Sequence, residues 1–131
     1  MLLAVDFQSD VPIYIQLKQQ IIEGIARGRL AEGESLPSVR QLAQDIGINL
    51  HTVNKAYSLL KEGGFIIMDR RKGAVINTRQ AMAAGDCREK LRDELAPIIA
   101  EVFCKGMKEE ELIQEIARIY KSFSEDGKHG L

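Results

Sequence analysis

Two neighbouring segments of the chain, residues 38–46 and 50–62, carry apolar residues at the same helical spacing. The positions are Val39, Leu42, Ala43 and Ile46, followed by Val53, Ala56, Tyr57 and Leu60. Each set lies on one side of a 3.6-residue helix, so the pattern predicts two amphipathic helices. Gly47 suits the end of the first helix, and Asn49 suits the N-cap of the second. This arrangement is typical of a helix-turn-helix, although an ordinary helical hairpin has the same spacing.

A helix is also predicted before this pair, over residues 10–28. Asp10 is its candidate N-cap, and Gly28 suits its end. Its main apolar face consists of Ile13, Tyr14, Leu17, Ile21, Gly24 and Ile25. A second, narrower stripe on nearly the opposite side needs a packing partner of its own and consists of Ile15, Ile22 and Ala26.

Two β-prone runs, residues 65–69 and 74–78, come after the second helix of the pair. The short connection between them predicts a hairpin whose tip carries Arg70, Arg71 and Lys72. Three charges on a loop are often only a solvated surface. A hairpin directly after a helix-turn-helix, however, is typical of the wing of a winged helix, which contacts phosphates or the minor groove of DNA.

The C-terminal part predicts two more amphipathic helices, over residues 86–105 and 108–124. Their apolar stripes are Leu91, Leu95, Ile98, Ile99, Val102 and Phe103 in the first helix, and Leu112, Ile113, Ile116, Ile119, Tyr120 and Phe123 in the second. Residues 79–85 are either a linker or the first turn of the helix predicted over 86–105. The last eight residues, from Ser124 onward, are expected to be frayed.

The predicted fold is therefore mainly α with a small β-hairpin. It divides into a winged helix-turn-helix domain at residues 1–79 and a two-helix domain at residues 80–131.

The net charge of −1 hides an asymmetry, because residues 1–79 carry ten Lys and Arg against eight Asp and Glu. The basic excess thus lies in the half that contains the helix-turn-helix, and local patches matter more than the total charge.

The outer face of the second helix of the pair is free of acidic residues between Asp45 and Glu62. It consists of hydrogen-bonding side chains and one cation, which suit base edges and phosphates: Asn49, His51, Thr52, Asn54, Lys55 and Ser58. Arg40, on the outer side of the preceding helix, can reach the DNA backbone. These residue types in this pattern predict a DNA-reading surface.

Other classes of protein are poorly supported. The chain has no phosphate-binding glycine loop, no nucleophile elbow and no metal-ligand spacing, so we expect neither an enzyme nor a cofactor or metal site. It has no apolar run of about 18 residues and no secretion signal, which predicts a cytoplasmic protein without a membrane span. Cys87 and Cys104 are expected to be reduced, and redox sensing is left open.

The run from Gly28 to Tyr57, GRLAEGESLPSVRQLAQDIGINLHTVNKAY, resembles the winged helix-turn-helix of GntR-type bacterial transcription regulators. The similarity spans about residues 10–78 and is carried by the combination LPSxRxLA…GIN…TVxKAY. The short C-terminal helical pair resembles the small YtrA-like branch. This resemblance implies a cytoplasmic homodimer that binds a double-stranded, inverted-repeat operator, usually as a repressor.

The same resemblance implies the residues that contact DNA: Ser38, Arg40, Asn49, Leu50, His51, Thr52, Asn54, Lys55, Arg70, Arg71, Lys72 and Gly73. Many relatives have a basic residue or Pro where this chain has Leu50, and Asn or Thr where it has His51. Leu50 is therefore either a contact to a thymine methyl group or a packing residue. The wing keeps only Gly73 where relatives often have two glycines.

We expect residues 86–124 to form the dimerisation unit. Two helices with one stripe each cannot enclose a ligand pocket of about 300 Å³, but they can cover their stripes with a second copy. A palindromic site also needs two recognition helices at a fixed separation. The second stripe of the 10–28 helix is expected to pack against this unit. A small-molecule effector at the dimer interface is left open, and a winged-helix protein-interaction module is the alternative function.

Overall fold

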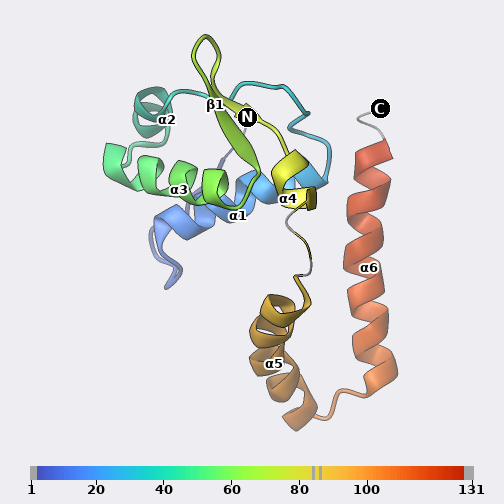
Figure 1. The fold of residues 1–131 in the computed structure, drawn as a ribbon. Helices are drawn as coiled ribbons and strands as arrows, with labels where there is room; N and C mark the ends of the chain where they lie inside the picture. The colour runs from blue at the N-terminus through green and yellow to red at the C-terminus, as the bar shows by residue number, and fades with distance from the viewer. Residues whose placement is uncertain (1–2, 84, 86, 129–131) are drawn as a thin grey trace.

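The computed structural model describes residues 3–83, 85 and 87–128, and shows a winged-helix unit followed by two long helices (Figure 1). The elements in chain order are α1 (Ile13–Ala26), α2 (Val39–Ile46), α3 (Leu50–Glu62), β1 (Ile66–Asp69), β2 (Gly73–Ile76), α4 (Arg79–Ala83), α5 (Arg88–Cys104) and α6 (Glu109–Lys128). In Figure 1, α5 leads away from the compact unit and α6 runs back toward it. The predicted fold, mainly helical with a two-stranded wing, is confirmed.

The two helices of the helix-turn-helix begin and end at the residues that the sequence indicates. Ser38 caps α2, where its Oγ accepts a hydrogen bond from the backbone N–H of Gln41 at 3.1 Å. Gly47 ends α2 with a left-handed φ of 77°, a conformation that costs glycine little. Asn49 Oδ1 then accepts from the backbone N–H of His51 at 2.7 Å. The predicted roles of Gly47 and Asn49 are confirmed.

The prediction that Asp10 caps α1 is wrong. Pro12 occupies the N-cap position with an extended backbone, and no described side chain caps this helix. Gln16 in the first turn instead bonds back to the N-terminal segment: its Oε1 accepts from the Asp6 N–H at 2.8 Å, and its Nε2 donates to the Asp6 carbonyl at 3.0 Å. This contact across ten residues holds the N-terminal segment against the first turn of α1, but it does not bond the N–H groups that open the helix.

The two-stranded hairpin is joined along one edge by a further segment of the chain. β1 pairs antiparallel with β2, with Asp69 opposite Gly73. Residues 33–36 lie along the other edge of β2, where the Leu36 N–H donates to the Ala74 carbonyl at 2.8 Å. The loop before α2 thereby ties the base of the wing to the helix-turn-helix.

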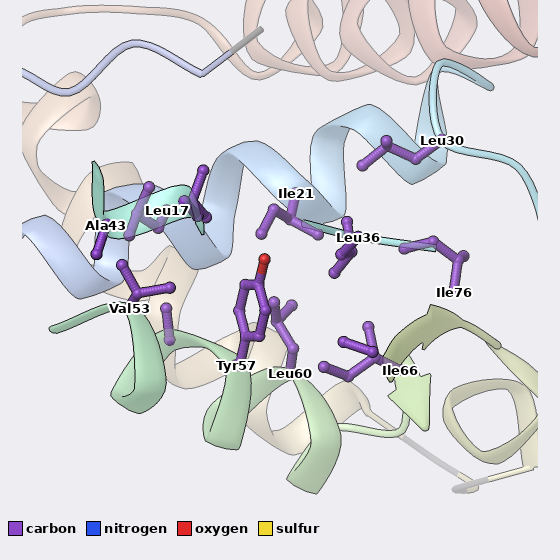
Figure 2. Close-up of a cluster of buried hydrophobic side chains, with 13 residues drawn as sticks. Leu17, Ile21, Leu30, Leu36, Ala43, Val53, Tyr57, Leu60, Ile66 and Ile76 are labelled. Carbon is purple, nitrogen blue, oxygen red and sulfur yellow. The ribbon is translucent and has the colours of Figure 1, made fainter. Parts of the chain in front are cut away.

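One apolar cluster holds the winged-helix unit together, and in Figure 2 the side chains of α1 face those of α3 across it. Its buried members are Leu17, Ile21, Leu30, Leu36, Leu42, Ala43, Val53, Ala56, Tyr57, Leu60, Ile66, Ala74 and Ile76. The predicted stripe of α3 is buried in full, whereas in α2 Leu42 and Ala43 are buried and the flanking Val39 and Ile46 are half-buried. Burial of this surface is the main force that orients α3.

The segment after the wing forms its own short helix, α4, rather than a linker or a first turn of α5. It lies directly on Gly64, which has a φ of 81° and where an added Cβ would approach Ala81 N to 2.5 Å. The expectation that the tail frays from Ser124 is wrong as far as Lys128, because α6 continues to that residue. Residues 129–131 lie outside the described part of the chain.

The two C-terminal helices bury little within one chain. No described side chain of α5 or α6 is buried. The most exposed apolar side chains of these helices, each 46–77% exposed, are Leu91, Ile98, Phe103, Ile113, Ile116, Ile119 and Tyr120. The others of the predicted stripes are half-buried: Leu95, Ile99, Val102, Leu112 and Phe123.

Arg27, which follows the last residue of α1, joins that helix to α6. Its guanidinium lies 4.5 Å from the centre of the Phe123 ring and donates to Ser122 Oγ at 3.4 Å. Ala26, in the stripe that we expected to face the C-terminal unit, stays exposed. Among the described residues, the junction is made at the end of that stripe, and Ile22 in the same stripe packs against the core cluster.

Candidate nucleic-acid interface

The outer face of α3 is presented to solvent because its opposite face is locked in the core. Val53, Ala56, Tyr57 and Leu60 are at most 4% exposed. The polar face therefore points outward, and its exposed members are Asn49, His51, Asn54, Lys55 and Ser58. Thr52 is half-buried at the start of the helix. The structure brings together the residues that the sequence placed on this face.

Lys55 is held more firmly than an ordinary surface lysine. Its Nζ lies 4.0 Å from the centre of the Tyr14 ring of α1, a cation–π geometry. The spacing of α1 placed Tyr14 on the core face, but did not reveal this contact, since it depends on how α1 crosses α3. The ammonium group is consequently positioned beside the α1–α3 junction.

The helix before the turn contributes two exposed polar groups, Ser38 and Arg40. Ser38 is already engaged as the N-cap of α2, so its hydroxyl has a structural task. Leu50, the residue with two open interpretations, is 42% exposed and lies outside the buried cluster. This exposure favours a surface contact over a packing role for Leu50.

The tip of the wing is organised by Asp69. Its Oδ1 accepts hydrogen bonds from the backbone N–H groups of Lys72, at 3.0 Å, and Arg71, at 2.8 Å. These two bonds to the charged carboxylate hold the pKa of Asp69 below its usual range. Asp69 was not among the residues predicted from the sequence, although an Asp at the start of a tight turn is a recognisable signal.

The three cations of the wing tip, Arg70, Arg71 and Lys72, are all exposed. Gly73 is not part of the tip itself, because it opens β2 with a φ of 74°. In Figure 1 the hairpin projects beyond the helices on the side where α2 lies. The positive charge of the wing is therefore carried away from the core and made accessible.

Other kinds of site find no support in the described structure. Residues 3–83, 85 and 87–128 contain no group of His, Cys, Asp or Glu that would hold a metal ion. None of the helices in that part of the chain is long and apolar enough to span a membrane. Cys87 and Cys104 are both exposed and free.

A helix-turn-helix with an outward polar face, followed by a cationic hairpin, defines a winged helix-turn-helix DNA-binding protein. The family of bacterial regulatory proteins named gntR matches residues 13–76. Over 131 aligned residues, the chain is 34% identical to the HTH-type transcriptional repressor YtrA of Bacillus subtilis (strain 168), with coverage of 98% of this chain and 97% of that protein. The chain belongs to the gntR family of DNA-binding transcription regulators, and it is not an enzyme.

Two solved structures extend the similarity to three dimensions. YtrA from Sulfolobus acidocaldarius, a GntR-family transcription factor, is 39% identical with a TM-score of 0.62, and the match covers 75% of this chain and 97% of that one. The AraR DNA-binding domain in complex with operator ORX1 is 28% identical with a TM-score of 0.51, covering 56% of this chain and 95% of that one. The match to YtrA-like proteins confirms the predicted short branch.

Proposed function

We propose that this regulator is a repressor that binds an inverted-repeat operator as a homodimer. The observation that carries the proposal is the exposed, acid-free polar face of α3 beside a wing with three exposed cations. A relative that matches nearly the whole chain, YtrA of Bacillus subtilis, is a transcriptional repressor. A repressor acts by occupying its operator, which needs no further catalytic or cofactor-binding part.

The contacts divide by chemistry. His51 and Asn54, at the exposed start and middle of α3, read base edges in the major groove, and Leu50 contacts a thymine methyl group. The remaining contacts position the protein on phosphates and in the minor groove, and are made by Ser38, Arg40, Asn49, Thr52, Lys55, Arg70, Arg71, Lys72 and Gly73. Base readout thus lies on one helix, while most of the positive charge lies around it.

The homodimer is formed by the C-terminal domain, residues 80–131. Soluble monomers rarely expose contiguous apolar surface of the extent seen on α5 and α6. Covering these side chains with a second copy places two recognition helices at a fixed separation, which a palindromic site requires. The winged-helix unit, residues 1–79, is then the DNA-binding domain.

Selection of bound sites from random duplex DNA, followed by titration of the selected site, tests this function. We expect an inverted repeat with a dissociation constant of about 10⁻⁸ M or tighter, and an affinity that falls steeply with salt as counterions rebind the phosphates. Selected sites without two-fold symmetry, or no binding at low salt, would contradict the proposal.

Two variants separate the two kinds of contact. Asn54→Ala is expected to reduce discrimination against a wrong base by about 1–3 kcal/mol, whereas Arg40→Ala weakens binding to all sequences alike and lowers the salt slope by about one unit. Lys90→Ala, on the exposed side of α5, is the charge control and leaves both quantities unchanged. Unaltered base preference in Asn54→Ala would show that α3 reads DNA with other residues.

A further inference from the structure

An open apolar groove runs along one side of α5, with a volume of about 590 Å³. Its apolar members recur every four residues at Leu91, Leu95, Ile99 and Phe103, with Leu91 52% and Phe103 77% exposed. This groove is uncovered in the single chain.

The spacing of these four residues is symmetric about Pro97. Leu91 and Phe103 lie six residues before and after it, and Leu95 and Ile99 lie two residues before and after it. If a second α5 packs antiparallel with a two-fold axis at Pro97, Leu91 of each copy faces Phe103 of the other. Leu95 then faces Ile99 in the same way. An isologous interface needs this kind of self-complementary surface.

The distribution of charge along the groove also favours an antiparallel pair of helices. Arg88 and Arg92 line its N-terminal half. At the opposite end, a second cavity of about 450 Å³ lies where α5 turns into α6, and its charged lining residues are Lys108, Glu109 and Glu110. With the axis at Pro97, Arg88 of one copy lies opposite Gly106 of the other, beside that acidic turn. A parallel arrangement would instead place the Arg88 residues of the two copies against each other.

Three of the four acidic residues of α5 lie away from the groove, and the fourth, Glu89, lies at its N-terminal edge. At 100° per residue, Asp93, Glu94 and Glu101 fall on the side away from the groove. Glu94 and Glu101 pair there with lysines of the same helix, at 3.9 Å from Lys90 and 3.1 Å from Lys105. The groove face is therefore apolar, its N-terminal end carries two arginines against one glutamate, and the turn beyond its other end carries a net negative charge.

We propose that the groove of α5 is covered by the α5 of a second copy in antiparallel orientation, with Arg88 and Arg92 of each copy facing Glu109 and Glu110 of the other. This inference rests on the proposed homodimer and specifies its geometry. It fixes the axis of the dimer near Pro97, and hence the direction in which the two winged-helix units leave the C-terminal helices.

The native cysteines report the orientation without any substitution. From the 1.5 Å rise per residue, the antiparallel arrangement offsets Cys87 of one copy from Cys104 of the other by only about 5 Å along the axis, but offsets the two Cys87 residues by about 30 Å. At 100° per residue both cysteines lie on the outward sides of the packed helices, so a link between them must span two helices. We expect a bismaleimide whose spacer spans two packed helices, about 15 Å, added to the full chain in the absence of DNA, to give a covalent dimer whose digest links the Cys87 and Cys104 peptides. A Cys87–Cys87 or Cys104–Cys104 link would indicate parallel helices and overturn the inference.

Charge reversal provides a second test, measured by sedimentation without DNA. Arg88→Glu/Arg92→Glu is expected to raise the dimer dissociation constant at least tenfold at low salt, and adding Glu109→Arg/Glu110→Arg in the same chain restores it. The matched control, Lys90→Glu/Lys105→Glu on the outward side of α5, leaves the constant unchanged. In a parallel dimer, the first pair of substitutions would not raise the dissociation constant in this way, and the second pair would not restore it.

The outcomes separate this inference from the proposed function. A parallel dimer that binds an inverted repeat would overturn the antiparallel geometry alone. A chain that stays monomeric at micromolar concentration would overturn both the geometry and the homodimer, and titration with operator DNA would still decide whether the winged-helix unit binds DNA.

Discussion

Tyr57 shows how a single side chain serves both the core and the helix-turn-helix. Its ring is only 4% exposed among the residues of the core, and its hydroxyl donates to the Pro37 carbonyl at 2.7 Å. This bond ties α3 to the turn that precedes α2. Burial raises the pKa of the Tyr57 hydroxyl well above its ordinary value of 10.0.

Tyr57→Phe is expected to lower the free energy of unfolding by about 1 kcal/mol at neutral pH, because the Pro37 carbonyl loses its donor. The raised pKa also sets a pH dependence. Above about pH 10 the unfolded chain releases this proton while the folded chain keeps it, so the wild type loses stability as pH rises. Thermal unfolding from neutral pH to about pH 11 should show a smaller loss in Tyr57→Phe. Tyr120→Phe, at a side chain that is 74% exposed, is the control and keeps the wild-type slope.

Asn49 has both a structural and a proposed DNA-binding role, and two substitutions separate them. Asn49→Ala removes the N-cap of α3 and is expected to cost about 1 kcal/mol of stability. Asn49→Ser keeps an oxygen that can accept from the His51 N–H, so it retains most of that stability. Urea unfolding measures the structural effect, and operator titration of the stable Ser variant measures the DNA contact. Equal stability of Asn49→Ala and the wild type would contradict the capping role.

Among the elements, the helix-turn-helix is the part that local patterns predict best. The bounds of α3 agree with the expected range of 50–62, and α2 begins one residue after the start of its predicted range. Both helices are short, both carry one apolar stripe, and both ends are set by adjacent capping residues. The start of α1 was not predictable in this way, because Pro12 occupies the N-cap position and no described side chain caps the helix.

The contact between α1 and α6 joins the winged-helix unit to the C-terminal helices, and it bears on how the proposed dimer would bind DNA. Arg27 contacts Phe123 and Ser122 of α6, and it also lies 3.7 Å from Glu23 of its own helix. This contact holds the winged-helix unit against a helix of the domain that we propose as the dimerisation domain. In the proposed dimer, the separation of the two recognition helices would depend on how firmly this contact is held.

Arg27→Ala is expected to weaken the preference of the dimer for one half-site spacing. We expect the ratio of affinities for the optimal operator and for one with a changed spacer to fall about tenfold, which corresponds to a coupling free energy of about 1.4 kcal/mol. Titrations with operators that differ only in spacer length measure this ratio. Arg29→Ala, at an exposed residue two positions later, is the control. An unchanged ratio in Arg27→Ala would show that the junction does not set the spacing.

At the scale of the whole molecule, buried apolar surface is distributed unevenly. All thirteen residues of the buried cluster lie between Leu17 and Ile76, whereas α5 contains no buried residue in the described chain. The winged-helix unit therefore has a core of its own, whereas the described side chains of α5 and α6 form no buried core within one chain. In the proposed homodimer, a second copy covers the exposed apolar side chains of these helices, so association adds to their stability.

The thermal unfolding midpoint is accordingly expected to rise with protein concentration, because association stabilises the folded chain. Ile116→Asp, at a side chain of α6 that is 46% exposed, should flatten this dependence by placing a charge in the interface. Met82→Asp, at an 82% exposed side chain of α4, is the control and preserves it. A midpoint independent of concentration in the wild type would contradict a dimer held by these helices.

The sequence by itself determined the elements and their exposed faces, because helical periodicity, caps and turn residues act within a few positions of one another. It thereby predicted the recognition helix, the wing and the polar surface between them. Tertiary structure alone decided the contacts between distant segments: Lys55 on Tyr14, residues 33–36 along β2, and Arg27 against α6. These depend on how helices cross and on which surfaces remain after the core has formed, and no local pattern encodes either.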